Sequence, residues 1–257
     1  MNRNSSTGKP YEAERSFLKD HVRQQIDFSQ TSQSQRMPAP PLQKPCLPES
    51  RRITLPDGAE ALVRLGAMPI GEAIKRRESV RRYTGEQLTL EELSSLLWAT
   101  QGVREVIGNT CALRTVPSAG ARHAFETYLA VMRVGSLEPG LYRYLPFDGQ
   151  LTQLAVDAQI GKKAALACLG QDFVAKAAVT FFWTTVPARM EWRYDRAAHK
   201  VIALDAGHVC QNLYLACTAM GMGTCAVAAY DQDDCDELLG VDGDEEFTVY
   251  VAPVGKC

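Results

Sequence analysis

The sequence predicts a protein of mixed α and β class, with a polar leader followed by one domain. Three observations predict the class: a helix with capping signals, strands rich in β-branched and aromatic residues, and a hairpin on a tight turn. The chain has 257 residues, 46% of them hydrophobic and 23% charged, which is ordinary for a globular protein. These values exclude wholesale disorder, collagen and coiled coil.

Residues 1–57 form the leader and differ in composition from the rest. Gln, Ser and charged residues dominate it, and five prolines fall within residues 37–49. Such a segment cannot build a core by itself. Two interpretations stay open. The segment is a flexible or extended leader, or it is an arm that its prolines hold extended so that it lies on another subunit.

A helix is predicted between Thr89 and Gly102. Thr89 and Glu92 have the spacing of a capping box, Leu88 and Leu93 that of a hydrophobic staple, and Gly102 is a stop signal. Both ends of this helix can therefore be predicted.

Strands are predicted over residues 125–134 and 177–184, where β-branched and aromatic residues are frequent. Residues 140–144 and 150–154 are expected to pair as a hairpin, because the segment between them ends in Asp148-Gly149. Strands and helices together place the chain in the mixed class.

A second helix is predicted to begin at Asp205, as its cap, and to continue to about Gly223. It carries two apolar stripes, one with Val209, Leu213, Ala216 and Met220 and the other with Cys210, Tyr214 and Cys217. Burial on both sides is typical of a helix in the centre of a large domain or in a dimer interface. The cysteines of this helix are interpreted as packing residues.

Charge, cysteine spacing and hydropathy argue against several classes of partner. Lys+Arg 28 against Asp+Glu 30 gives a net charge of −2, which offers no overall attraction to nucleic acid or to an anionic membrane. The eight cysteines contain no Cys-x-x-Cys, so no metal site is predicted. We find no apolar run of the roughly 18 to 20 residues that a membrane span requires. We therefore expect a cytoplasmic protein with reduced thiols.

The most distinctive polar cluster is Lys75-Arg-Arg-Glu-Ser-Val-Arg-Arg82, which gathers five cations and a hydroxyl. Such a run is usually a solvated basic face. It also has what a phosphate needs, namely guanidinium groups for bidentate bonds and a serine hydroxyl. The Gly221-Met-Gly223-Thr-Cys-Ala226 run imitates a dinucleotide fingerprint. It closes a predicted helix instead of opening one, so a Rossmann site is excluded.

Four motifs follow one another along the chain. They are Arg77-x-Ser79-x-Arg81, Pro117-Ser-Ala-Gly120, the helix from Asp205 to Gly223 with its Thr-Cys-Ala-Val-Ala-Ala229 sequel, and the closing Pro253-Val-Gly-Lys256. In this order they resemble the nitroreductase superfamily, and the first three look like its SagB-type dehydrogenase branch. The resemblance extends from about Ile70 to the C-terminus.

The resemblance implies an α+β sandwich over residues 58–257, with a mixed sheet flanked by helices. It also implies that the protein binds FMN and forms an intertwined homodimer with each flavin between the subunits. Arg77, Ser79 and Lys256 would hold the phosphate. Arg81 would lie near the ribityl chain or the pyrimidine edge.

The resemblance also assigns two segments to the flavin ring. The small residues that would pack against the ring from the other subunit are Pro117, Ser118, Ala119 and Gly120. The residues whose backbone would lie near the hydride-accepting edge are Val227, Ala228 and Ala229. Small side chains suit the first place because the backbone must approach a planar ring closely.

The sequence departs from the family pattern at two places. Glu78 stands where many relatives carry a basic residue or histidine, so its carboxylate must point away from the phosphate or pair with Arg76 or Arg81. In azoline-oxidising members a Lys-Tyr pair is tied to proton removal, and here Arg193 replaces the lysine. Because a guanidinium does not deprotonate, Tyr194 is the candidate for catalytic proton transfer. Its alternative is a packed aromatic side chain.

We therefore expect a homodimeric FMN-dependent oxidoreductase that transfers hydride between the flavin and a small, flat, conjugated substrate, with NADH or NADPH as reductant. One alternative is a SagB-type dehydrogenase that oxidises an azoline-like heterocycle or another small metabolite. A non-enzyme alternative is a flavin-binding dimeric scaffold. No nucleic acid, membrane or metal is expected as a partner.

Overall fold

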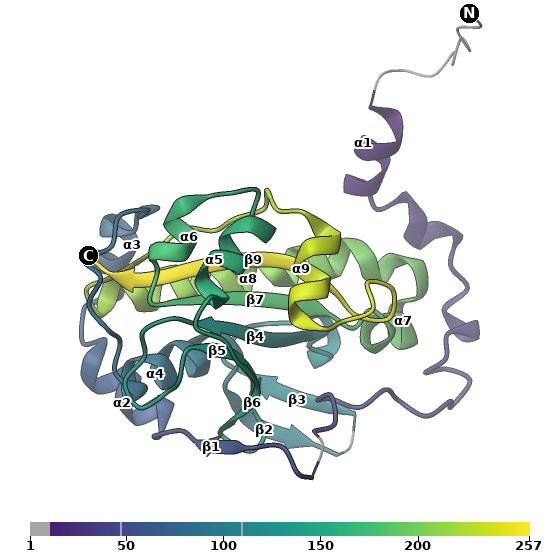
Figure 1. Ribbon diagram of the computed structural model, residues 1–257. Helices are drawn as coiled ribbons and strands as arrows, with labels where there is room; N and C mark the ends of the chain where they lie inside the picture. The colour runs from purple at the N-terminus through teal and green to yellow at the C-terminus, as the bar shows by residue number, and fades with distance from the viewer. Residues whose placement is uncertain (1–10, 47, 109) are drawn as a thin grey trace, which may run out of the picture.

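Helices cover both faces of a seven-stranded sheet in the computed structural model, which describes residues 11–46, 48–108 and 110–257 (Figure 1). The sheet strands are β1 (Arg52–Thr54), β4 (Phe125–Val131), β5 (Gly140–Leu145), β6 (Gln150–Val156), β7 (Val179–Thr185), β8 (Met222–Thr224) and β9 (Phe247–Lys256). A separate hairpin consists of β2 (Val103–Ile107) and β3 (Cys111–Arg114). The predicted α+β class is confirmed.

The α-helices are α1 (Glu12–Leu18), α2 (Gly58–Leu65), α3 (Ile70–Arg76), α4 (Leu90–Gln101), α5 (Ile160–Ala167), α6 (Asp172–Lys176), α7 (Ala188–Tyr194), α8 (Ala198–Ala219) and α9 (Gln232–Leu239). Short 3-10 helices are η1 (His21–Gln25), η2 (Phe28–Gln30), η3 (Ala119–Ala121) and η4 (Asp195–Ala197). In the part of the chain that the structure describes, we find no helix with the length and hydropathy of a membrane span.

The large sheet has the strand order β1-β6-β5-β4-β7-β9-β8, and each of its paired strands is antiparallel. The expectation of a mixed sheet is corrected in this detail. Among the described residues, parallel pairing occurs in the isolated bridge between Leu88 and Val134. The physical reason is the connectivity, because β4, β5 and β6 follow one another through short turns, which join only antiparallel neighbours.

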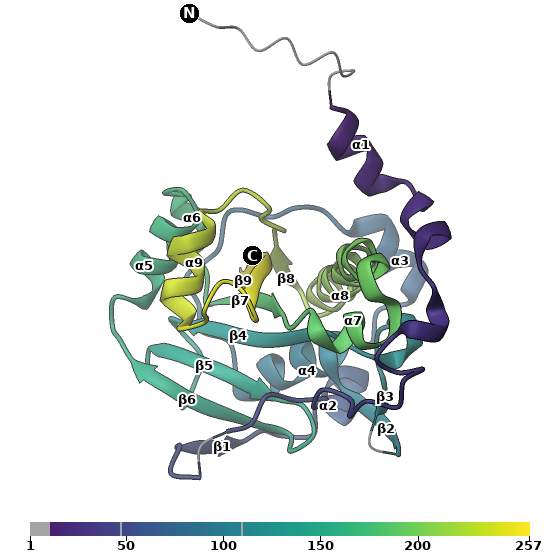
Figure 2. The same cartoon turned by 90° about the vertical axis from the view of Figure 1, so that its right-hand side faces the viewer.

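Two hydrophobic cores lie on the two faces of the sheet. On β4, Leu129 and Val131 face the core formed with α4 and α8, whereas Tyr128 and Ala130 face the core formed with α5 and α9. This alternation follows from the two-residue period of a strand. Viewed along the sheet, α5, α6 and α9 cover one side and α2, α4 and α8 the other (Figure 2).

The structure confirms the predicted elements that depend on local signals. Helix α4 has the full capping box, with Glu92 N–H donating to Thr89 Oγ1 at 3.1 Å and Thr89 N–H donating to Glu92 Oε2 at 2.8 Å. Strands β4 and β7 occupy the two predicted segments, and β5 and β6 form the predicted hairpin, with Gly149 in the left-handed region.

The predicted start of the second helix is wrong. Helix α8 begins at Ala198, two turns before Asp205, so Asp205 lies inside the helix and does not cap it. The Asp205 carboxylate accepts instead from the backbone N–H of Ala119, at 3.3 Å. A capping aspartate accepts from backbone N–H groups in the first turn of its own helix. The Asp205 side chain accepts instead from a backbone N–H that lies 86 positions away in sequence. Both apolar stripes are largely buried, as expected.

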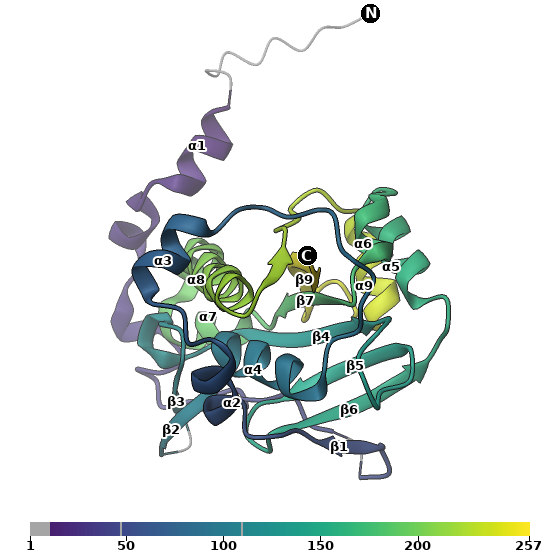
Figure 3. The same ribbon diagram turned by 90° about the vertical axis from the view of Figure 1, so that its left-hand side faces the viewer.

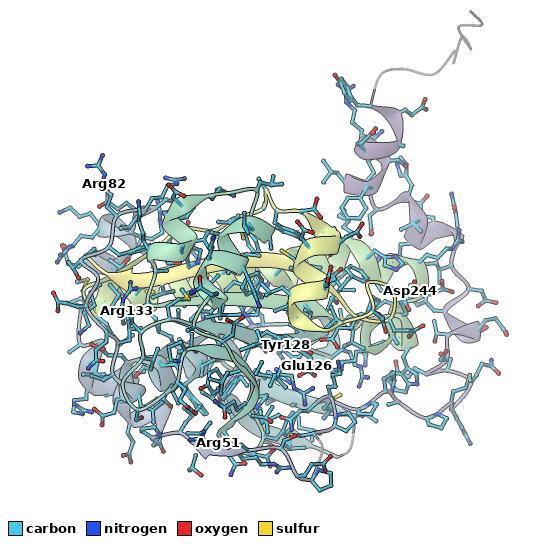
Figure 4. All side chains as sticks on the ribbon, in the orientation of Figure 1. Arg51, Arg82, Glu126, Tyr128, Arg133 and Asp244 are labelled. Atoms are coloured by element: carbon cyan, nitrogen blue, oxygen red, sulfur yellow. The ribbon has the colours of Figure 1, made fainter. Side chains whose placement is uncertain are left out.

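Residues 31–46, which we call the strap, run along the body of the protein from α7 toward the sheet, with turns over residues 31–36 (Figure 1). Three buried arginines donate to its main-chain carbonyls: Arg189 to Pro41 at 2.8 Å, Arg114 to Leu42 at 3.2 Å and Arg143 to Pro45 at 2.7 Å. Glu126 and Tyr128 lie beneath the strap (Figure 4), and Lys44 contacts both. Strand β1 follows, so residues of the predicted leader also extend the sheet.

Candidate functional site

The basic loop after α3 crosses the end of the sheet beside the C-terminus (Figure 3). Val80 N–H donates to the Thr224 carbonyl and Thr84 N–H to the Lys256 carbonyl, each at 2.9 Å. Helix α3 ends at Arg76, so Arg77 and the residues after it belong to this loop. The loop is therefore fixed by its backbone, which leaves its side chains available for a ligand.

Two glycines allow the loop to approach the sheet. A Cβ on Gly223 would lie 2.5 Å from Val80 Cβ, and one on Gly255 would lie 2.7 Å from Tyr83 Cγ. Such distances are shorter than any real Cβ contact, so larger residues in β8 and β9 would push the loop away.

The arginines of the basic cluster form no ion pair with any carboxylate that the structure describes. Within the described ranges, no carboxylate lies within 4.0 Å of the guanidinium groups of Arg76, Arg77, Arg81 or Arg82. Arg82 points away from the body into solvent (Figure 4). Glu78 pairs with none of these cations, so their charge is uncompensated. Uncompensated guanidinium groups beside a serine hydroxyl suit a phosphate.

The structure brings Arg77 and Ser79 together on one residue of α8. The Arg77 guanidinium lies 5.3 Å from the ring centroid of Tyr214, and Ser79 Oγ lies 2.9 Å from Tyr214 Oη. Arg81 is directed elsewhere, with its guanidinium 5.9 Å from the ring centroid of Phe173 in α6. Two of the predicted phosphate ligands therefore share one neighbour.

Lys256, the third predicted phosphate ligand, is held by a carboxylate. Its Nζ lies 2.8 Å from Glu92 Oε1, while the other oxygen of Glu92 accepts from Thr89 at the start of α4. The structure thus brings Lys256 to the capping box and not into contact with Arg77 or Ser79. An anion on the loop would compete with Glu92 for this ammonium group.

The segment after β8 presents small residues with available backbone. Val227 is buried and exchanges both backbone hydrogen bonds with Val251, so its N–H and carbonyl are occupied. Ala228 and Ala229 are exposed, and the Ala229 carbonyl accepts from Gln171 Nε2 at 2.8 Å. Of the three predicted residues, Ala228 is therefore the one with both backbone groups free of a described hydrogen bond.

An apolar groove of about 550 Å³ opens beside Ala228, between α8 and the C-terminal part of the sheet. Ile202 and Ala206 of α8 line one side, and Tyr250 of β9 lines the other. Aliphatic and aromatic walls suit a flat apolar group.

The Pro117–Gly120 segment continues into a strained turn. Gly120, Ala121 and His123 have φ values of 61°, 52° and 47°, in the left-handed region that residues other than glycine rarely adopt. The turn is held by Ser118 Oγ, which accepts from His123 N–H at 3.0 Å, and by the bond from Ala119 to the buried Asp205. Backbone strain of this kind persists where surrounding contacts determine the conformation, and it is frequent at functional sites.

Tyr194 lies directly against this turn. A Cβ on Gly120 would stand 2.7 Å from Tyr194 Oη and 2.8 Å from Arg193 Nε. Arg193 itself lies over the Tyr194 ring, with 5.6 Å between its guanidinium carbon and the ring centroid. The structure therefore brings the predicted catalytic tyrosine to the predicted ring-contacting turn.

Helix α7, which carries Tyr194, is fastened from two sides. Trp192 Nε1 donates to the Met37 carbonyl of the strap at 2.9 Å, and Gln33 N–H donates to the Trp192 carbonyl at 2.8 Å. On the other side, the buried Arg122 donates to the Arg189 carbonyl at 2.8 Å and stacks over the Trp192 ring. Sequence reasoning missed these contacts, because no local pattern marks an arginine or tryptophan as a brace.

Helix α8 separates the two halves of the candidate site. Asp205 anchors the turn at Ala119, and Tyr214 contacts Ser79 of the basic loop. These two residues of α8 are nine positions apart, which places them about 13 Å apart along the axis and half a turn around it. The turn with Tyr194 and the basic loop therefore lie on opposite sides of the same helix.

The described architecture defines an α+β protein with a basic, phosphate-suited loop and a small-residue turn on two sides of a central helix. Residues 74–256 match the nitroreductase family. A protein of Methanocaldococcus jannaschii named "Putative nitroreductase MJ1384" is 33% identical over 208 residues, which is 81% of this chain and 98% of that protein. The chain belongs to the nitroreductase family.

Two further similarities cover less of the other protein. The trifolitoxin-processing protein TfxF of Rhizobium leguminosarum bv. trifolii is 34% identical over 125 residues, which is 47% of this chain and 40% of TfxF. A crystal structure from Anabaena variabilis, described as a "putative nitroreductase", superposes with a TM-score of 0.65 at 24% identity. That match covers 81% of this chain and 42% of the Anabaena chain, and it shows that the two share a fold.

Proposed function

We propose that this chain is a homodimeric FMN-dependent oxidoreductase that transfers hydride between the flavin and a small, flat, conjugated substrate, with NADH or NADPH as reductant. Membership of the nitroreductase family supports an oxidoreductase. When bound, the flavin supplies the two-electron chemistry, and the protein supplies binding, orientation and electrostatics. We also propose a cytoplasmic location, where thiols such as those of the buried Cys210 and Cys217 stay reduced.

The residues present fit FMN at its phosphate end. Arg77 and Ser79 offer a cation and a hydroxyl that together match a phosphate dianion, and no described carboxylate pairs with Arg77. The exposed backbone of Ala228 and the apolar groove beside it suit a planar ring. We assign Lys256 to the phosphate as well, which requires that it leave Glu92 when the anion binds.

The observation that carries the dimer is the division of the site by α8. Within one chain, the turn with Tyr194 lies on the side of the helix opposite to the basic loop. A single flavin contacts both sets of residues if they come from two chains related by symmetry. We therefore assign Pro117–Gly120 and Tyr194 to the flavin bound by the partner's loop.

Tyr194 would act as a positioning or proton-donating group above the ring. Nitro and quinone substrates take up protons that solvent can supply, so orientation matters more for them than a dedicated acid. Arg193 covers the ring of Tyr194 and packs against it.

The experiment is reduction of the purified protein by NADH and NADPH under anaerobic conditions. A yellow protein whose flavin absorbance is lost on addition of either nucleotide supports the proposal. A colourless protein that does not take up FMN contradicts it. Analytical ultracentrifugation at assay concentration tests the dimer, because an active, flavin-loaded monomer is incompatible with a site that needs two chains.

A SagB-type dehydrogenase that oxidises a heterocycle is the second candidate, and the similarity to a protein named for trifolitoxin processing favours it. The variant Tyr194→Phe separates the two. A reductase should lose about ten-fold or less in NAD(P)H-driven turnover, whereas loss of a general base costs on the order of 10² to 10⁴. A thousand-fold loss at full flavin occupancy therefore favours the dehydrogenase.

A further inference from the structure

Tyr214 lies between the two segments that the proposed flavin site requires within one chain. Its Oη is 2.9 Å from Ser79 Oγ in the basic loop and accepts from Ala226 N–H at 2.8 Å. In the part of the chain that the structure describes, it is the side chain that hydrogen bonds to both the basic loop and residues 226–229. These segments are almost 150 positions apart in sequence, so α8 brings them to one hydroxyl.

The hydrogen bond from Ala226 determines which hydroxyl donates in the contact between Tyr214 and Ser79. Because Ala226 N–H donates to Tyr214 Oη, the phenol proton remains free to donate to Ser79 Oγ. Ser79 can then direct its own proton toward a third group, and the exposed side of the loop is where an anion would lie. In the reverse arrangement Ser79 donates its proton to Tyr214 and has none left to donate to an anion. An anion on the loop therefore favours the arrangement in which all three donors are satisfied.

The ring of Tyr214 also orients the second predicted phosphate ligand. The Arg77 guanidinium stacks 5.3 Å from the ring centroid, a geometry that attracts a cation to the face of an aromatic ring. Ring and hydroxyl thus act on Arg77 and Ser79 separately. Replacement by phenylalanine removes the hydroxyl and keeps the ring, so the two contributions can be measured apart.

We propose that Tyr214 is a positioning residue that couples occupation of the phosphate anchor at Arg77 and Ser79 to the placement of residues 226–229. An anion that fixes the Ser79 proton also fixes the Tyr214 hydroxyl, and this strengthens the bond from Ala226. The segment that would meet the reactive edge of the flavin is then ordered by binding at the other end of the ligand. This inference rests on the proposed function.

The first measurement is hydrogen exchange at the Ala226 amide. In the flavin-free full-length protein, Tyr214→Phe should accelerate exchange at this amide about ten-fold, because the amide loses its acceptor. FMN, and inorganic phosphate used alone as a probe, should slow the exchange in the wild type and leave it unchanged in Tyr214→Phe. Unaltered exchange in the variant would overturn the proposal.

The second measurement is FMN affinity in a double-mutant cycle. Tyr214→Phe and Ser79→Ala should each weaken binding by up to about ten-fold, and the double variant should be little worse than either. Two independent residues would multiply their effects to about a hundred-fold, which overturns the coupling. Thr218→Val is the matched control, since its hydroxyl donates only to the Tyr214 carbonyl one turn away.

The two proposals fail in different ways. If wild-type protein binds no FMN, the proposed function is wrong, while exchange at Ala226 in ligand-free protein still shows whether Tyr214 holds the segment. If FMN binds but neither Tyr214→Phe nor phosphate changes hydrogen exchange at the Ala226 amide, only the proposed coupling is wrong. Should Tyr214→Phe not fold, Ser79→Ala carries the test, because phosphate must then no longer slow the Ala226 amide.

Discussion

Acidification should open the strained turn through His123. This side chain is 3% exposed, and burial lowers its pKa to about 3, with the nearby Arg114 as a second cause. An unfolded histidine has a pKa of about 6.5. Between these two values the unfolded chain binds a proton that the folded chain excludes, so stability falls as the pH falls through this window.

The expected magnitude follows from the shift. Each pKa unit corresponds to about 1.4 kcal/mol, so exclusion of the proton from the folded state lowers the free energy of unfolding by about 2 kcal/mol at pH 5 and by about 4 kcal/mol at pH 3. The backbone N–H of His123 donates to Ser118 Oγ in the turn that contacts Tyr194. We therefore expect activity to be lost together with the stability of this turn.

Urea denaturation of the wild type and of His123→Asn at pH 7.5 and pH 5.0 measures this effect. Among replacements that keep a side chain, asparagine is one of those that best tolerate the left-handed φ of 47°. The wild type should lose about 2 kcal/mol more than His123→Asn between the two pH values. His21→Asn, at an exposed position, is the control. Equal losses in wild type and His123→Asn would refute the reasoning, provided that flavin and protein concentrations are held constant.

Three further outcomes are expected. Arg77→Ala should weaken FMN binding about ten- to a hundred-fold in equilibrium titration, whereas Lys256→Ala should cost less because that lysine already has Glu92 as partner. Gly120→Ala should destabilise the protein and lower turnover at full flavin occupancy, since its Cβ would meet Tyr194 Oη at 2.7 Å. Leu213→Asp, at a fully buried position of α8, should abolish folded protein in circular dichroism, because a buried unpaired carboxylate costs several kcal/mol.

Elements whose signals lie within a few residues of one another can be predicted from the amino-acid sequence. The capping box of α4 joins Thr89 and Glu92 three positions apart, and the β5–β6 hairpin depends on one turn. The basic loop after α3 was visible for the same reason, as was the double burial of α8. Local hydrogen bonds and periodicity decide these features, so they could be predicted before any packing was known.

The partners of the polar side chains in the site depend instead on how the chain packs. Asp205 matches a capping residue in sequence, yet it bonds to Ala119 from inside α8. Lys256 is held by Glu92, 164 positions away, and Tyr214 joins Ser79 to Ala226 across the end of the sheet. Partners far apart in sequence are brought together by the packing of the layers around α8. Local sequence patterns do not specify that packing, so these partners could not be predicted from them.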